Sequence, residues 1–125
     1  MYTIGLKRDF IARHSLIGGD WGEENTPHAH HYVVEIRLEG RDLDRHGYLT
    51  DICDIESALD AQVDFYRDKM LNDLPGFKNL NPSLEQFAAV ICTGVSERIQ
   101  TRHLTALIVK VWENESAWAE FRKEF

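Results

Sequence analysis

Hydrophobic and polar residues alternate along two segments near the start of the chain. In residues 2–14, one face carries Ile4, Leu6, Phe10, Ala12 and His14. In residues 28–40, one face carries His28, His30, Tyr32, Val34, Ile36 and Leu38. Because strand side chains point alternately to opposite faces, a period of two predicts two β-strands. The glycine-rich, polar residues 15–27 between them predict a loop.

The middle of the chain has a helical period instead. Residues 51–71 place apolar side chains three or four positions apart, which predicts an amphipathic helix with a core face of Ile55, Leu59, Val63, Tyr66 and Met70. "NDLPGF" interrupts the pattern. Residues 81–99 predict a second helix, which opens on a Ser83/Gln86 capping box and has a core face of Leu84, Phe87, Ile91, Val95 and Ile99.

The last part of the chain completes a mixed domain. Residues 103–113 are apolar and β-branched and predict a third strand, whereas residues 117–125 fit a short final strand or a helical turn. This order indicates one α+β domain over residues 1–125, an antiparallel four-stranded sheet with two helices packed on one face. A sheet this small has two exposed edges, so we expect an oligomer that continues the sheet between subunits.

Composition and charge narrow the class of protein. The chain has 125 residues with 43% hydrophobic content, which suits a single domain with a modest core. Its net charge of −7 argues against nucleic-acid binding, and no segment is apolar and long enough to span a membrane. We therefore expect a soluble, cytoplasmic protein. Cys53 and Cys92 lie in apolar-periodic segments without CxxC spacing and predict two buried thiols.

Histidines concentrate where the first two strands meet. His28 and His30 share a face, His31 points the other way, and an antiparallel neighbour could bring His14 opposite the pair. Three neutral imidazoles with an open fourth position would make a catalytic zinc site. The same pattern also fits surface or capping histidines around a loop, and the spacing alone leaves both interpretations open.

Several motifs together resemble a known family. They are H-x-H-x-Y at 28–32, "GYLTDICDIESAL" at 47–59, "LNDLPGF" at 71–77, "NPSLEQFA" at 81–88 and "VKVWE" at 109–113. Over nearly its whole length the chain resembles the 6-pyruvoyltetrahydropterin and 6-carboxytetrahydropterin synthases. The resemblance implies the tunnelling fold, in which trimers close a β-barrel and two trimers stack into a hexamer, with sites at subunit interfaces.

The resemblance also implies roles for individual residues. The zinc ligands of the family fall on His14, His28 and His30, and its pterin-anchoring glutamate falls on Glu113. A carboxylate there can accept two parallel hydrogen bonds from the amino group and ring N–H of a pterin. Glu85, in the first turn of the second helix, matches a further glutamate of the family. It would line the pocket, or it would lie there because the positive end of the helix favours a carboxylate.

Two departures concern the acid–base groups. The family's general-base cysteine precedes the H-x-H pair, but here that stretch holds Glu23 and Glu24. The family's Asp-His pair falls on Arg67 and Asp68. In addition, Ala29 replaces the glycine between the two metal histidines.

These departures leave several interpretations. One is a zinc-dependent lyase acting on 7,8-dihydroneopterin triphosphate or a close relative, in which Glu24 or Glu23 serves as the base in an aldolase-like cleavage, with Asp68 as a further catalytic candidate. Another is a zinc-containing pterin or purine binder without synthase activity, with Arg67 contacting a phosphate or carboxylate. His31 and His103 are further acid–base candidates, and a purely structural or interaction protein is the third class.

Overall fold

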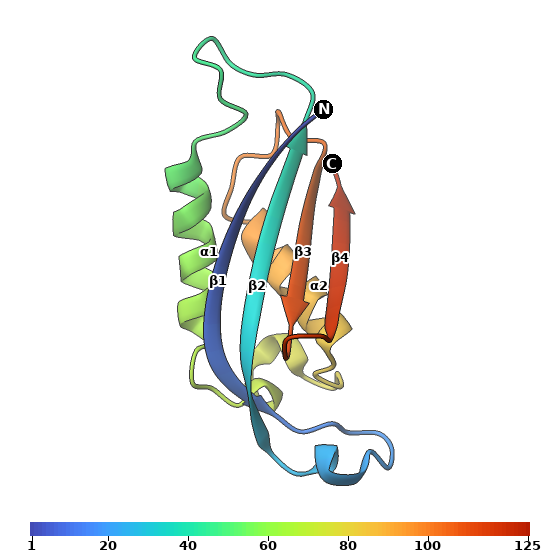
Figure 1. Cartoon of the computed structure of the whole chain (residues 1–125). Coiled ribbons are helices and arrows are strands. Elements are labelled where there is room, and N and C mark those ends of the chain that lie inside the picture. Colours follow the sequence, from blue (N-terminus) through green and yellow to red (C-terminus); the bar gives the residue numbers. More distant parts are fainter.

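The computed structural model describes residues 1–125 and contains one four-stranded antiparallel sheet (Figure 1). The strands follow the order of the chain: β1 (Tyr2–His14), β2 (His28–Gly40), β3 (Ala106–Trp112) and β4 (Trp118–Glu124). The first two strands form a long ribbon whose far end extends past β3 and β4 (Figure 1). The sequence pattern of residues 117–125 fits either a strand or a helical turn, and the structure shows that this segment is a strand.

Two α-helices cover one face of the sheet (Figure 1). Helix α1 (Ile52–Tyr66) packs against β1, and helix α2 (Leu84–Ser96) packs against β3 and β4. Each begins at a side-chain cap: Asp51 accepts a hydrogen bond from the Cys53 amide, and Ser83 accepts one from the Gln86 amide at 3.2 Å. The predicted cap at Ser83 is thus present and fixes where α2 starts.

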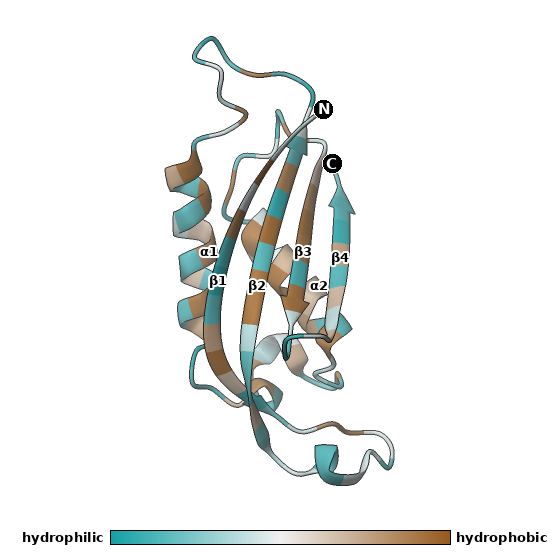
Figure 2. Cartoon of the chain, in the orientation of Figure 1, coloured by the Kyte–Doolittle hydropathy of each residue, from teal (hydrophilic) through white to brown (hydrophobic).

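The core lies between the sheet and the helices. Teal and brown alternate along the strands in Figure 2, as a sheet with one buried face requires. Phe87 of α2 is at the centre of an aromatic cluster, with ring centroids 5.0–5.9 Å from those of its neighbours: Phe10, Tyr32, Tyr66 and Phe77. This cluster supports the end of the sheet that carries the histidines.

Two expectations about residues at helix ends are wrong. Helix α1 ends at Tyr66, because Asp68 adopts a left-handed backbone (φ 61°) and the chain then joins the edge of β1, where the Asp68 amide donates to the Ile11 carbonyl. Met70 therefore lies beyond the helix. Ile99 likewise follows the end of α2, although it still packs against the core.

The cysteines also differ from expectation. Cys92 is buried in α2, where burial raises the pKa of its thiol to about 11. Cys53 is exposed, because it lies in the first turn of α1, on the side away from the sheet. The prediction of two buried thiols holds for Cys92 alone.

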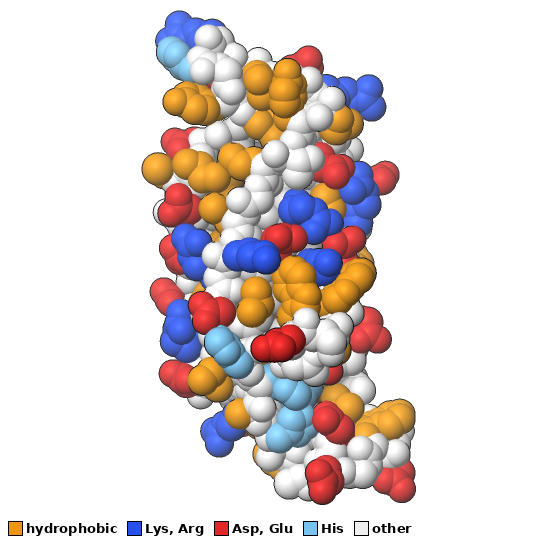
Figure 3. Space-filling view, viewed as in Figure 1, with side chains coloured by type: hydrophobic (Ala, Val, Ile, Leu, Met, Phe, Trp, Pro, Cys, Tyr) orange, Lys and Arg blue, Asp and Glu red, His pale blue; other side chains and the backbone are white.

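The other face of the sheet carries charged side chains of both signs (Figure 3). Arg37 pairs with Glu35 at 2.8 Å and with Glu120 at 2.7 Å, and Arg122 pairs with Glu39 at 2.7 Å. No helix of the chain has the length and apolarity that crossing a membrane requires.

Candidate metal centre and adjoining pocket

The register of the first two strands brings three histidines together. His14 is directly opposite His28, and Ala12 is opposite His30. Because all three histidines occupy the same side of the alternation, their rings meet beneath the sheet, with centroids 4.6, 4.8 and 5.0 Å apart. His31 points to the other face, where its Nε2 lies 2.7 Å from Asp9.

Backbone carbonyls fix the tautomers of two of these histidines. Nδ1 of His14 is 2.8 Å from the Pro82 carbonyl, and Nδ1 of His28 is 2.8 Å from the Thr26 carbonyl. A carbonyl only accepts hydrogen bonds, so each Nδ1 must carry the proton and donate it. Nε2 of each neutral ring then presents a lone pair to the centre of the cluster, as in metal-binding histidines whose other nitrogen donates to a backbone carbonyl.

The three Nε2 atoms are buried without a hydrogen-bond partner. Such orphaned buried atoms are rare, and a shared cation would satisfy all of them at once. His14 is 2% exposed, and burial lowers its pKa, which favours the neutral form that a metal requires. The donor set therefore fits a zinc ion, which prefers nitrogen and oxygen ligands of this kind.

Glu24 reaches the same cluster from the loop between the strands. It lies in a short 3-10 turn, η1 (Gly22–Asn25), and its Oε2 is 3.0 Å from Nε2 of His28. One donor atom from Glu24 and one from each of the three histidines all lie within 4.8 Å of one another. Glu23 precedes it but is exposed and is not part of this group.

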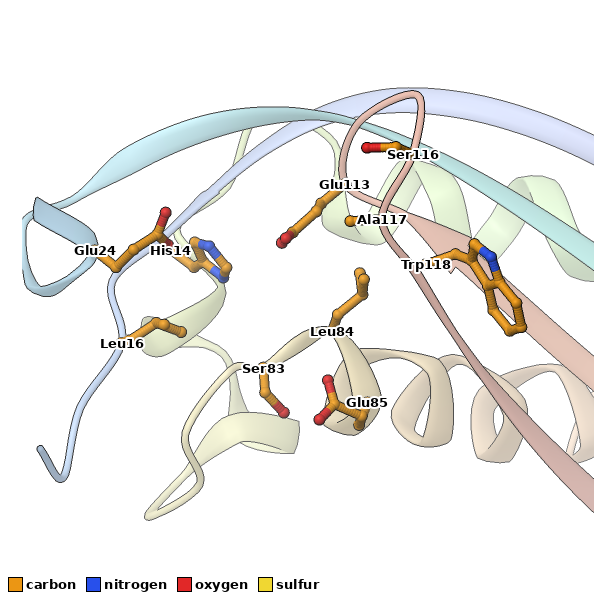
Figure 4. A pocket seen from close by; sticks show the side chains of 10 residues that line it. All are labelled: His14, Leu16, Glu24, Ser83, Leu84, Glu85, Glu113, Ser116, Ala117 and Trp118. Carbon is orange, nitrogen blue, oxygen red and sulfur yellow. The ribbon is translucent and has the colours of Figure 1, made fainter. Parts of the chain in front are cut away.

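A cavity of about 520 Å³ adjoins the cluster. It runs from His14 and Glu24 past the start of α2 to the turn between β3 and β4, and Figure 4 shows the side chains around it. Glu113 projects into it from the end of β3, with Oε2 3.8 Å from Nε2 of His30. Glu85 lines the far side together with Trp118.

The structure separates the other candidates from this cavity. Arg67 and Asp68 are exposed in the turn after α1 and do not line it. His103 lies in the loop before β3, beside a different cavity. Within the single chain, the candidates that gather around the cavity are thus His14, Glu24, Glu85 and Glu113. No sequence pattern points to Trp118 or to the carbonyl of Pro82.

Comparisons with known proteins agree with this arrangement. A family model described as 6-pyruvoyl tetrahydropterin synthase matches residues 3–124. A curated Archaeoglobus fulgidus protein, provisionally named 6-carboxy-5,6,7,8-tetrahydropterin synthase, is 26% identical over 123 residues, which is 96% of this chain and 95% of the relative.

Solved structures share the fold at lower identity. The 6-pyruvoyl tetrahydropterin synthase of Caenorhabditis elegans superimposes with a TM-score of 0.87 at 18% identity, covering 98% of this chain and 96% of the other. A Plasmodium vivax 6-pyruvoyltetrahydropterin synthase, solved as a variant with a catalytic glutamate changed to alanine, gives a TM-score of 0.78 at 16% identity and full coverage of both chains.

Fold and site together define an α+β protein of the tunnelling-fold type, with a histidine cluster beside a carboxylate-lined pocket. The chain belongs to the 6-pyruvoyl tetrahydropterin synthase family.

Proposed function

We propose that this protein is a zinc-dependent lyase of pterin metabolism that acts on 7,8-dihydroneopterin triphosphate or a close relative. The observation that carries the proposal is the set of three buried, unpartnered Nε2 atoms of His14, His28 and His30 at the mouth of a carboxylate-lined cavity. Family membership supports a pterin as the ligand.

The three histidines would hold the zinc ion. When bound, zinc supplies a Lewis acid that polarises a hydroxyl or carbonyl oxygen of the substrate. The carbonyls of Pro82 and Thr26 keep His14 and His28 in the ligating tautomer, and this second layer of contacts orients the rings before any ligand arrives.

Two carboxylates would orient the pterin ring. Glu113 projects into the cavity, where its two oxygens can accept hydrogen bonds from the amino group and ring N–H of a pterin. Glu85 adds a second acceptor at the opposite wall, in the first turn of α2. The two carboxylates would thus bind the polar edge of the pterin ring, and the substituent of the ring would point toward the histidines.

Glu24 would act as the base in place of the family's cysteine. It is the carboxylate nearest the histidine cluster, and the Plasmodium vivax relative is described as having a catalytic glutamate. Removing the proton of the second side-chain hydroxyl would turn its carbon into an aldehyde and break the bond to the hydroxyl-bearing carbon beside the ring, in an aldolase-like cleavage. The electron pair of that bond would pass to the pterin, whose side-chain carbon would take up a proton. The products would be a hydroxymethylpterin and a triphosphate-bearing aldehyde. Glu23, which is exposed and outside the cluster, is the weaker candidate for this role.

We further propose that the functional form is a cytoplasmic homo-oligomer, a trimer or a hexamer. Both outer strands of the sheet have free edges, with β1 covered only where residues 68–70 approach Ile11 and Arg13. Pairing of β1 with β4 of a neighbour would close these edges. Arg67 and Asp68 lie on that side of the molecule and could contribute to a pocket shared between subunits.

Product analysis tests the proposed activity. Zinc-loaded protein is incubated with 7,8-dihydroneopterin triphosphate, and the products are resolved by mass. A hydroxymethylpterin is expected if Glu24 replaces the cysteine in a cleavage reaction, whereas a pyruvoyl or carboxy product would indicate the usual chemistry of the family. Absence of any product while zinc and pterin both bind would favour a pterin or purine binder without synthase activity.

A further inference from the structure

We propose that Glu24 is the fourth ligand of the resting metal centre and that Asn25 holds it there, so that the site is closed until a substrate atom takes the place of the carboxylate. The metal ligand is inferred from geometry alone, whereas the later release of Glu24 as a base rests on the proposed function.

The contact between Glu24 and His28 fits a cation that both groups share. Nδ1 of His28 donates its proton to the Thr26 carbonyl, so Nε2 of the neutral ring has no proton to offer. Yet the carboxylate Oε2 of Glu24 lies 3.0 Å from that atom, and Nε2 has no hydrogen-bond partner. A cation between the two atoms would hold them at this distance, and one cation shared with His14 and His30 would serve all four groups, whereas a second proton on the His28 ring would serve only this pair.

The loop that carries Glu24 is built around the side chain of Asn25. Its Oδ1 accepts from the Trp21 amide at 2.7 Å, and its Nδ2 donates to the carbonyls of Leu16 and Gly19 at 3.1 and 3.0 Å. The Leu16 amide in turn donates to the Glu24 carbonyl at 2.8 Å. These bonds fix the backbone of Glu24 relative to the end of β1, on which His14 stands.

A second contact anchors this loop to the rest of the site. The Ile17 amide donates to Oδ1 of Asn81 at 2.8 Å, immediately before Pro82, whose carbonyl holds His14. The loop is otherwise exposed, so this hydrogen bonding, and not burial, determines where the carboxylate stands. Asn25 is therefore a positioning residue for Glu24.

Four protein ligands make a closed site of the kind that structural zinc ions have, whereas catalytic sites keep one position open. A carboxylate on a hydrogen-bonded surface loop can serve in both kinds of site, because it can leave the metal without unfolding the core. Released from the metal by a substrate oxygen, Glu24 would be free to accept a proton from the substrate.

Cobalt(II) substitution tests the ligand directly and needs no substrate. Metal-free protein is titrated with Co²⁺, and the visible absorption spectrum is recorded before and after addition of azide. In the native chain we expect a weaker spectral response to azide than in the Glu24 variants, because azide must first displace Glu24 from the fourth position. In Glu24→Ala we expect an altered spectrum, a response to azide, and Co²⁺ affinity lower by about tenfold or more, since even indirect contacts to metal ligands are worth that much.

Glu23→Ala is the matched control, because Glu23 is the neighbouring carboxylate on the same turn but outside the cluster. It should retain the native spectrum and show the same azide response as the native chain. Glu24→Gln preserves the size of the side chain and serves if Glu24→Ala fails to fold. The proposal is overturned if the Glu24 variants match Glu23→Ala in spectrum, Co²⁺ affinity and azide response.

Asn25→Ala tests the positioning role. We expect its cobalt protein to gain an azide response between those of the native chain and Glu24→Ala, with the same secondary structure by circular dichroism. A native response in a folded Asn25→Ala protein would refute the positioning role of Asn25.

The outcomes separate this inference from the proposed activity. A Glu24→Gln protein with native cobalt spectra but no turnover would leave the base role standing and remove the ligand role. An altered cobalt spectrum in Glu24→Gln, together with a native chain that never turns over a pterin, would leave the ligand role standing and remove the proposed activity.

Discussion

Zinc should stabilise the folded chain through His28 and not through His31. The ion would bind only the folded state, because the strand register is what brings its ligands together. At free zinc about a thousandfold above its dissociation constant, mass action adds about 4 kcal/mol to the free energy of unfolding. The chain has 125 residues, and an unfolding entropy of about 2.1 cal/mol/K per residue then converts this gain into a rise in Tm of about 15 °C.

The assay is thermal unfolding followed by circular dichroism, in excess zinc and in EDTA. His28→Ala should lose most of the rise, while its Tm in EDTA should stay close to native because the side chain is already one-quarter exposed. His31→Ala is the control: it lies three residues away, on the opposite face of the sheet beside Asp9, and should keep the full rise. An equal zinc effect in both variants would refute the assignment of the metal centre.

Four further predictions follow from the site and the core. Glu24→Gln should abolish turnover while pterin binding persists, with Glu23→Gln remaining active in the same product assay. Glu113→Gln should weaken pterin binding by about 1.5–3 kcal/mol, the usual worth of a hydrogen bond to a charged group, measured by calorimetry. Phe87→Ala should reduce the free energy of unfolding by about 3–5 kcal/mol in urea titrations, because it removes the centre of the buried aromatic cluster. In EDTA, the free energy of unfolding should fall as the pH drops below about 6.5, because burial lowers the pKa of His14 in the folded chain and the unfolded chain then binds a proton that the folded chain does not. The control is His14→Ala: its free energy of unfolding should not change with pH in this range, whereas that of the native chain should.

The histidine cluster could be predicted because it depends on strand geometry alone. Alternation places His28 and His30 on one face, and an antiparallel partner brings the end of its neighbour, His14, opposite them. The helix cap at Ser83 could be predicted equally well, because a hydroxyl side chain followed three residues later by Gln86 is a local sequence signal. Elements that follow from local period or pairing were therefore accessible from the sequence.

Features set by tertiary contacts were not accessible. Met70 fits the helical period of the preceding residues, but the edge of β1 offers the backbone hydrogen bonds that end the helix earlier. Cys53 lies in an apolar-periodic segment, yet the direction of α1 leaves it in solvent. The role of Asn25 depends on three partners within a loop, and an asparagine in a glycine-rich stretch is too common to reveal it.

The choice between Glu23 and Glu24 shows the same limit. Both are acidic residues in the same short turn, and no periodicity distinguishes them. The structure turns the Glu24 carboxylate toward the histidines and leaves Glu23 outside the cluster, because the turn is fixed by the hydrogen bonds of the surrounding loop. A candidate site on an irregular loop is thus harder to predict than one on paired strands.

The most direct test of the account is to measure bound zinc and product formation in the same samples while zinc is titrated into metal-free protein with 7,8-dihydroneopterin triphosphate. We predict that turnover rises in proportion to bound zinc and levels off at one ion per chain, and that His28→Ala shows neither. Turnover that persists in EDTA, or a fully loaded protein that forms no product, would contradict the assignment of this chain as a zinc-dependent pterin lyase.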